Sequence, residues 1–267
     1  MNDFCNQYFF YRGSLADRCR MMDKKQFEQT LVLIKPDALK NSITGFIFSQ
    51  LSEFHTGARF ASAKIVNVSR FLAEEHYAEH KGKPFYEPLL DYITGAIHYS
   101  EQDKWKRRVI AIVYQGPGVL ATVRSIAGPT NPHKAREEKP GCIRSLGTVV
   151  PIKDASGEII SERMDNLIHA SANAEDAERE IKLWFVPQDF PPLMRAYPTE
   201  ICRTHYYYKA GRLYDTYEPD SLFLLAPGDE AWKTDLEILD SYARNKPTQH
   251  RLNTVVAKYL INRSQPY

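Results

Sequence analysis

The feature that most constrains the fold is an alternation of short apolar segments with amphipathic segments between residues 28 and 185. Residues 30–34 (TLVLI) are almost entirely apolar and are followed by Lys35 and Pro36, which is typical of a buried central strand. Residues 43–54 instead repeat apolar side chains at helical spacing, and Gly57 beyond them is a C-terminal stop. The patterned region therefore begins with a strand followed by a helix.

The same two patterns recur along the rest of this region. Further strands are predicted at 59–68, 109–114 and 167–168, and further helices at 71–81, 86–93, 119–126 and 174–184, the last capped by Asn173. A hairpin is predicted within 145–162, where a turn at 153–158 lies between apolar stretches. Residues 128–141 hold three prolines and many charges, and we expect a loop there. This order predicts an α/β sandwich in which helices cover one sheet.

The pattern changes after residue 186. Residues 186–198 are proline-rich, residues 206–225 carry aromatic and apolar side chains around a glycine and a proline, and two amphipathic helices close the chain. Their apolar faces are Trp232, Leu236, Leu239 and Tyr242 in the first helix, and Leu252, Val255, Val256, Tyr259 and Leu260 in the second. We expect these faces to pack back on the preceding region; an oligomer or partner interface is the alternative. No basic stripe accompanies the tyrosines at 206–208, so a nucleic-acid platform is not expected.

Composition argues against several classes of protein. The 35 basic and 33 acidic residues nearly balance, which gives no reason to expect a binder of nucleic acid or of membrane surfaces. The four cysteines (Cys5, Cys19, Cys142 and Cys202) form no CxxC pair, so reduced thiols are expected rather than a metal site or a disulfide framework. No apolar stretch approaches the roughly 18 residues of a membrane helix, and the N-terminus lacks the basic region of a signal peptide. The expected location is the cytoplasm.

The most informative string for chemistry is residues 166–171 (NLIHAS). A histidine at the end of a short apolar strand, next to the start of a helix, can stand exposed in a cleft. His169 also has a hydroxyl two residues on, at Ser171, and a carboxylate on the next helix, at Glu180, that could hold its ring. A neutral imidazole is a competent nucleophile near pH 7. The alternative is a structural histidine with satisfied hydrogen bonds.

Four segments of the chain resemble, in the same order, the motifs of nucleoside diphosphate kinases. They are residues 30–37 (TLVLIKPD); His76 and Tyr77 with residues 83–86 (KPFY); Arg124 with residues 128–132 (GPTNP) and 139–144 (KPGCIR); and residues 166–171 with residues 177–185 (AEREIKLWF). Together they make the resemblance specific, and it covers the chain from about Glu28 to Phe185. The resemblance implies a ferredoxin-like, antiparallel four-stranded sheet covered by helices.

The resemblance also implies a reaction. His169 would accept the γ-phosphoryl group from a nucleoside triphosphate such as ATP and pass it to a nucleoside diphosphate, which gives ping-pong kinetics. Mg²⁺ would arrive bound to the nucleotide, and no metal ligands of the protein's own are expected. The base would stack on a flat ring, which tolerates every base, so the resemblance implies a broad base range. The partners are therefore nucleoside di- and triphosphates.

Each site residue takes its role from this resemblance. Lys35, Tyr77, Arg124, Thr130 and Arg144 match positions that handle the phosphates, and Asn166 matches the residue at the sugar hydroxyl and phosphate end, which Lys35 also reaches. Phe85 matches the aromatic ring under the base, and Ser171 and Glu180 match the pair that positions the histidine. Arginine suits phosphate because its planar donors bind two oxygens at once, and phosphoryl transfer asks the protein mainly for positioning and positive charge.

Several features depart from the family pattern. Ala172 replaces an acidic residue that lies near the metal-bound nucleotide in the family, so Mg²⁺ positioning is open to change. Insertions are predicted near 96–107 and 145–162, and the loop from Thr130 to Arg144 is slightly long. That loop takes part in subunit contacts in the family, so we expect a homo-oligomer of at least a dimer rather than the usual hexamer. The predicted organisation is an N-terminal extension (1–28), a kinase-like domain (29–186) and a C-terminal extension (187–267).

Two alternatives to an enzyme of broad base range stay open at this point. The chain could be a catalytically weak nucleotide-binding or scaffold protein of the same fold, as Ala172 and the insertions allow. It could also be an active enzyme whose base choice is restricted by the 145–162 insertion.

Overall fold

The computed structural model describes residues 28–261. Apart from Glu28, the predicted N-terminal extension lies outside these residues, as do Cys5 and Cys19. Cys142 and Cys202 are both buried and free. Among the described residues, no helix has the length and apolar character needed to cross a membrane.

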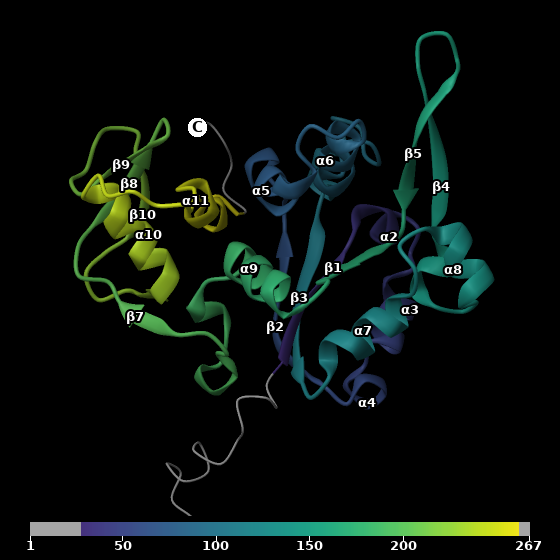
Figure 1. Cartoon of the computed structure of the whole chain (residues 1–267), viewed down its shortest axis with the longest axis horizontal. Helices are drawn as coiled ribbons and strands as arrows, with labels where there is room; N and C mark the ends of the chain where they lie inside the picture. The colour runs from purple at the N-terminus through teal and green to yellow at the C-terminus, as the bar shows by residue number, and fades with distance from the viewer. Residues whose placement is uncertain (1–27, 262–267) are drawn as a thin grey trace, which may run out of the picture.

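A four-stranded antiparallel sheet forms the centre of the protein (Figure 1). Its strands are β1 (Glu28–Ile34), β2 (Arg59–Val66), β3 (Val109–Gly116) and β6 (Ile168–Ala170), in the spatial order β2-β3-β1-β6. Every neighbouring pair is antiparallel. Helices connect β1 to β2, and a helix follows β3 before the chain returns to β6. This is the ferredoxin-like arrangement, so the predicted fold class is confirmed.

Both faces of the sheet are covered, which explains the unbroken apolar run of the first strand. Leu31 and Leu33 pack into one apolar cluster, whereas Val32 and Ile34 pack into a second cluster on the opposite face. The first cluster is shared with α5 (Arg70–His76), α6 (Tyr86–Thr94) and α9 (Ala174–Trp184). The second is shared with α2 (Pro36–Lys40), α3 (Thr44–Gln50) and α7 (Val119–Ala127); α4 (Glu53–Thr56) follows α3 and contacts α7.

Helix α9 carries Glu180 and begins where the sequence predicts. The Asn173 side chain accepts a hydrogen bond from the Asp176 amide at 2.9 Å, which satisfies one of the free donors at the helix start. Ala177 and Ile181 lie on its buried face, and Glu180 is buried beside them. The cap therefore fixes the first turn of the helix from which Glu180 projects.

Residues 128–141 are not the predicted loop, because they contain the helix α8 (Pro132–Glu138). Pro132 occupies the first helical turn. Proline has no backbone N–H, but the N–H groups of the first turn have no partner within the helix, so the helix loses no hydrogen bond there. Asn131 caps the helix by accepting hydrogen bonds from the amides of His133 and Lys134. The prediction was wrong because it took a proline that starts a helix for one that prevents it.

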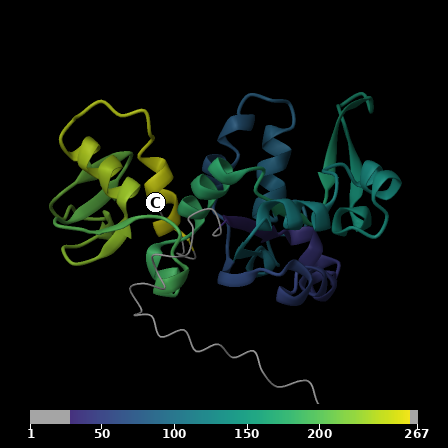
Figure 2. The same ribbon diagram turned by 60° about the horizontal axis from the view of Figure 1, so that its bottom comes forward.

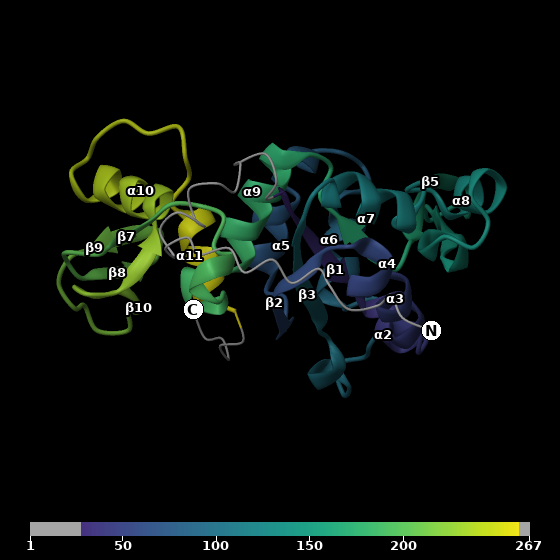
Figure 3. The ribbon, with the colours of Figure 1, turned by 90° about the horizontal axis from the view of Figure 1, so that it is seen from below.

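The predicted hairpin is present as β4 (Thr148–Lys153) paired with β5 (Ile159–Asp165). Asp154 stabilises its turn by accepting hydrogen bonds from the amides of Ser156 and Glu158. In the three views of the protein, the hairpin and the tail lie at opposite ends of the central sheet (Figure 1, Figure 2 and Figure 3). The short 3-10 helices are η2 (Ala78–His80), η3 (Lys104–Lys106), η4 (Ile143–Leu146), η5 (Pro187–Asp189) and η6 (Pro192–Met194).

The tail folds into two small sheets and two helices around a third apolar cluster. Its elements are β7 (Thr199–Ile201) with β11 (Glu230–Trp232), β8 (Tyr206–Lys209) with β9 (Arg212–Tyr214) and β10 (Leu222–Leu225), and the helices α10 (Lys233–Ala243) and α11 (Asn253–Tyr259). The predicted apolar faces are buried at Leu239, Val255, Val256 and Leu260, but Tyr242 is exposed.

The tail packs back on the preceding part of the chain, as predicted. Helix α11 contacts α5 and α9, and Ala257 of α11 belongs to the apolar cluster that covers the central sheet. Trp232 joins the same cluster, and its indole nitrogen donates to the Phe185 carbonyl at 2.8 Å. The tail thus covers the outer side of α5 and α9, away from the cavity described below.

Candidate active site

His169 stands on β6 with one ring nitrogen held and the other available. Its Nε2 lies 2.8 Å from Glu180 Oε2. Burial alone would raise the pKa of Glu180, but the interactions with His169 and the hydroxyl of Ser171 outweigh it and lower the pKa to about 2. The carboxylate is therefore ionised and can only accept, so Nε2 carries the proton and donates. Among residues 28–261, no side chain or backbone group bonds Nδ1, which is left with its lone pair free.

Ser171 anchors the carboxylate that holds the histidine. The Ser171 hydroxyl donates to Glu180 Oε2 at 2.7 Å and accepts from the Leu31 amide at 3.1 Å. Because Ser171 is fully buried and Glu180 is 4% exposed, neither group can turn away without leaving a buried polar atom unpaired. The orientation of the His169 ring is consequently fixed by hydrogen bonds that lead back, through Glu180 and Ser171, to the central strand.

The backbone before the histidine is strained. Leu167 has φ of 70°, in the left-handed region that a branched side chain seldom adopts. Its carbonyl accepts from the Lys35 amide at 2.9 Å, and its amide donates to Asp37 Oδ2 at 3.0 Å. These two bonds from the end of β1 hold the turn that brings Asn166 and His169 to the same side.

His76 packs against His169 from behind, a contact that the sequence alone did not identify. The two rings meet edge to face with centroids 4.7 Å apart, and His76 is 2% exposed. Burial lowers the pKa of His76 well below its usual value, and the positive charges of Arg179 and Lys35 act in the same direction. The Trp184 indole donates to His76 Nδ1 at 3.2 Å, so the neutral His76 ring carries its proton on Nε2.

His76, His169 and Glu180 lie close enough together to raise the question of a metal ion, with ligand atoms within 4.8 Å of one another. The hydrogen bonds argue against one. The bond from Trp184 occupies the lone pair of His76 Nδ1, and Nε2 is protonated, so the ring has no lone pair left for a metal. The cluster suits the positioning of an imidazole better than the binding of a cation.

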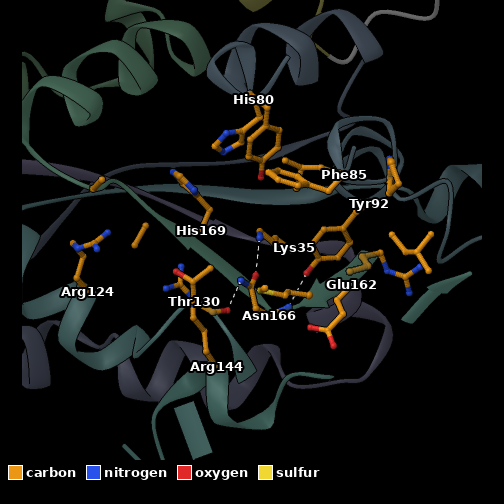
Figure 4. Close-up of a pocket in the computed structure, with 18 residues that line it drawn as sticks. Lys35, His80, Phe85, Tyr92, Arg124, Thr130, Arg144, Glu162, Asn166 and His169 are labelled. Carbon is orange, nitrogen blue, oxygen red and sulfur yellow. Dashed lines mark hydrogen bonds between the residues drawn. The ribbon is translucent and has the colours of Figure 1, made fainter. Parts of the chain in front are cut away.

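The ring of His169 borders a cavity of about 430 Å³, a size suited to a small organic ligand. Eight of the ten predicted site residues line it: Lys35, Tyr77, Phe85, Arg124, Thr130, Arg144, Asn166 and His169. The other two, Ser171 and Glu180, lie behind the histidine and act through it. Figure 4 shows the labelled members of this set converging from several elements of the fold.

Three cations face this cavity, and none of them has a carboxylate partner. Among the described residues, no acidic group lies within ion-pair distance of Lys35, Arg124 or Arg144. The Arg144 guanidinium donates only to backbone carbonyls, at Gly128 (2.9 Å) and Ile168 (3.3 Å), and its Nε has no partner. Burial, together with the nearby charge of Arg124, lowers the pKa of Arg144 to about 10. Unneutralised guanidinium groups in one cavity favour a multiply charged anion.

Lys35 and Asn166 form a fixed pair in the middle of the cavity. Lys35 Nζ donates to Asn166 Oδ1 at 2.8 Å, and Asn166 Nδ2 donates to the Thr130 carbonyl at 3.0 Å (Figure 4). Burial lowers the pKa of Lys35 to about 8, although Asp37 acts in the opposite direction. The ammonium group can still donate two hydrogen bonds to a ligand.

Tyr77 and Phe85 line the side of the cavity formed by α5 and α6. The Tyr77 hydroxyl is buried and has no hydrogen-bond partner within the described part of the chain, and burial raises its pKa. Such a group is available to donate to a ligand oxygen. Phe85 is 37% exposed and presents an open aromatic face next to His80.

The hairpin between β4 and β5 supplies lining residues that the sequence did not identify. Ile152, Glu162, Arg163 and Met164 border the cavity, as do further residues outside the hairpin: His80, Pro88, Leu89 and Tyr92. The only signal for the hairpin residues was the extra length between Arg144 and Asn166. That length does not reveal which side of the site the hairpin covers.

The same part of the chain matches known proteins. The family model described as nucleoside diphosphate kinase matches residues 28–190. The nucleoside diphosphate kinase of Thermococcus kodakarensis is 38% identical over 168 residues, which covers 63% of this chain and 82% of the relative. That of Thermus thermophilus is 37% identical over 162 residues, which covers 61% of this chain and 98% of the relative. A solved nucleoside diphosphate kinase of Aquifex aeolicus is similar at 27% identity with a TM-score of 0.49, over 62% of this chain and 99% of that one.

The matched part contains the central sheet, the hairpin and the whole cavity, and it ends before β7. It also accounts for well over half of the chain. The chain belongs to the nucleoside diphosphate kinase family.

Proposed function

We propose that this protein is a nucleoside diphosphate kinase that transfers a γ-phosphoryl group through a phosphohistidine on His169. One observation carries the proposal. The free Nδ1 of the half-buried His169 borders a cavity with three cations that lack acidic partners. A nucleophile surrounded by unneutralised positive charge suits an electrophile that carries several negative charges, such as a nucleoside triphosphate.

The first half of the reaction is a displacement at phosphorus. The Nδ1 lone pair of His169 attacks the γ-phosphorus of a nucleoside triphosphate, an N–P bond forms, and the bond from phosphorus to the bridging oxygen breaks. The nucleoside diphosphate leaves with the electron pair of that bond. The ring becomes positively charged while Nε2 keeps its proton, and the ionised Glu180 at 2.8 Å stabilises that charge. The second half reverses these steps with another diphosphate.

The remaining site residues bind and position the nucleotide. Arg124, Arg144, Thr130 and Tyr77 contact the phosphates, and Lys35 with Asn166 contacts the sugar hydroxyl and the phosphates next to it. The base stacks on Phe85, and stacking alone accepts every base. Mg²⁺ enters with the nucleotide as part of the substrate. Ala172 borders the cavity without offering a ligand, so the phosphates and water hold the ion on that side.

Labelling of the enzyme tests the proposal. Incubation with γ-labelled ATP is expected to place an acid-labile, base-stable label on the protein, and addition of unlabelled GDP should release it as labelled GTP. His169→Ala removes the label, whereas His205→Ala, which changes an exposed histidine of the tail, keeps it. Absence of label from the wild type, or full labelling of His169→Ala, contradicts the proposal. Tight ADP binding without phosphate transfer favours the scaffold alternative.

A further inference from the structure

The β4–β5 hairpin adds a wall to the cavity that binds the nucleotide. Glu162, Arg163 and Met164 of β5 border it four to two residues before Asn166, and Ile152 of β4 borders it from the paired strand. Phe85 borders the same cavity from the other side. In Figure 4, Tyr92 lies between Phe85 and Glu162. Helix α6, which begins directly after Phe85, contacts β5, so a base stacked on Phe85 lies on the side of the cavity next to the hairpin.

Arg163 is held in one orientation on this wall. Its Nε donates to Asp165 Oδ1 at 2.7 Å, and one terminal nitrogen donates to Asp165 Oδ2 at 3.0 Å. Asp165 is 7% exposed, and His98 from the 96–107 insertion lies 3.8 Å from its second oxygen. Two parallel hydrogen bonds fix the guanidinium plane, and a fixed guanidinium plane can stack on a base.

Glu162 stands out because its charge has no partner. It borders the cavity, it is exposed, and no hydrogen bond or ion pair joins its carboxylate to any other of residues 28–261. A free carboxylate repels phosphates, whereas Lys35, Arg124 and Arg144 attract them. Charge therefore favours a nucleotide that binds with its phosphates at these three cations and its base nearer Glu162.

We propose that Glu162 is a specificity-determining residue that makes this enzyme favour guanine over uracil in the diphosphate acceptor. The inference rests on the proposed function. A carboxylate only accepts hydrogen bonds. Guanine offers N1–H and an exocyclic N2–H side by side, so both oxygens of the carboxylate can accept from it. Uracil offers a single N3–H between two carbonyl oxygens, which the carboxylate repels. Adenine and cytosine each offer one amino group, and they fall between the two.

A competition between acceptors tests the inference. The phosphoenzyme is first made with ATP and freed of nucleotide, and it is then mixed with equal concentrations of GDP and UDP. We expect the GTP formed to exceed the UTP by at least about fivefold, the lower limit for one good bidentate contact with a base. Glu162→Gln should bring the ratio close to one, because the amide can also donate to a uracil carbonyl. Glu158→Gln, on the exposed turn of the same hairpin and outside the cavity lining, should keep the wild-type ratio.

The outcomes separate this inference from the proposed function. A wild-type ratio near one, or an unchanged ratio in Glu162→Gln, overturns the inference while phosphate transfer itself stands. A ratio that falls equally in Glu162→Gln and Glu158→Gln also overturns it, because the effect then belongs to hairpin charge in general. If no phosphoenzyme forms in the wild type, the proposed function fails first.

Discussion

At the scale of single residues, the site depends on which nitrogen of His169 is free. Glu180 and Ser171 form a buried chain of hydrogen bonds that begins at the Leu31 amide of the central strand. His76 closes the rear of the ring, and Trp184 fixes the His76 tautomer. The free nitrogen of His169 is thus determined by residues that do not contact the nucleotide.

The charge of Glu180 should matter to catalysis. Glu180→Gln keeps the size of the side chain but removes the charge that stabilises the phosphorylated ring. A charge-assisted hydrogen bond contributes about 1.5–3 kcal/mol, so we expect kcat to fall by roughly 10- to 100-fold. Steady-state transfer of phosphate from ATP to GDP measures kcat. Glu178→Gln, on the same helix but paired with Lys182, serves as the control and should retain activity; an equal loss in both variants would point to the helix rather than to the contact.

The pH dependence should report Lys35. Its ammonium is charged below a pKa of about 8 and neutral above it, since burial favours the neutral form. We therefore expect kcat/KM to decrease as the pH rises through about 8. Bound phosphates favour the charged form, so kcat should decrease only at higher pH. In Lys35→Arg the guanidinium stays charged, and the alkaline decrease should disappear from kcat/KM even if the rate is lower. If kcat/KM of Lys35→Arg still decreases through the same pH range, another group is responsible for the decrease.

At the scale of elements, the strands and most helices could be predicted because their apolar patterns match their burial. Residues 31–34 of β1 are all apolar because both faces of the strand are covered there. Helix α9 shows a helical repeat because only one of its faces is covered. Helix α8 could not be predicted by counting prolines, because a proline at a helix start and a proline in a loop look alike in a sequence. The motif residues meet in one cavity as expected, but their roles there stay predictions.

The hairpin shows where sequence reasoning stops. Its strands and turn were predicted from local pattern, but its contribution to the cavity depends on contacts with α6, some 70 positions away. One example lies directly after β5, where the Asn166 amide donates to the Tyr92 hydroxyl at 3.1 Å. His76 was missed for a similar reason. Its partner Trp184 is 108 residues distant, and nothing near His76 in the sequence indicates that contact.

The cap of α9 should contribute to stability as well as to geometry. Asn173→Ala leaves the Asp176 amide without its partner, and loss of such a cap costs about 1 kcal/mol of folding free energy. Urea unfolding followed by circular dichroism measures the change. Asn173→Ser retains an oxygen at the cap and should recover most of the stability. If the alanine and serine variants are equally unstable, the cap hydrogen bond is not the cause.

At the scale of the whole molecule, the chain combines the family fold with a tail that has its own apolar cluster. We propose that residues 29–186 form the kinase-like domain and residues 187–267 an extension docked on α5 and α9. A buried ion pair in the tail, Lys258 with Asp235 at 2.6 Å, lies beside this contact. The tail leaves the cavity open and covers the far side of the helices that carry Tyr77 and Glu180. The cytoplasmic location expected from composition stays a prediction.

Self-association is predicted at the edge of the central sheet that β2 forms. β2 is an edge strand, and Phe60 and Ile65 on it are exposed, as is Phe54 of α4 at 93%. Exposed aromatic rings that lie together on a surface favour an interface with a second copy. We expect at least a dimer in sedimentation velocity. Phe54→Ser should raise the dissociation constant of the dimer roughly tenfold, because the variant loses the burial of one large apolar side chain. Phe223→Ser, an exposed tail position, is the control; a monomeric wild type at micromolar concentration would refute the prediction.

The most direct test of the account is to find which nitrogen of His169 carries the phosphate. Protein with ¹⁵N-labelled histidine is phosphorylated with ATP, and phosphorus–nitrogen NMR couplings identify the bonded ring atom. Because Glu180 holds Nε2 through its proton, the account predicts phosphate on Nδ1 alone. Phosphate on Nε2, or on any histidine other than His169, would contradict it.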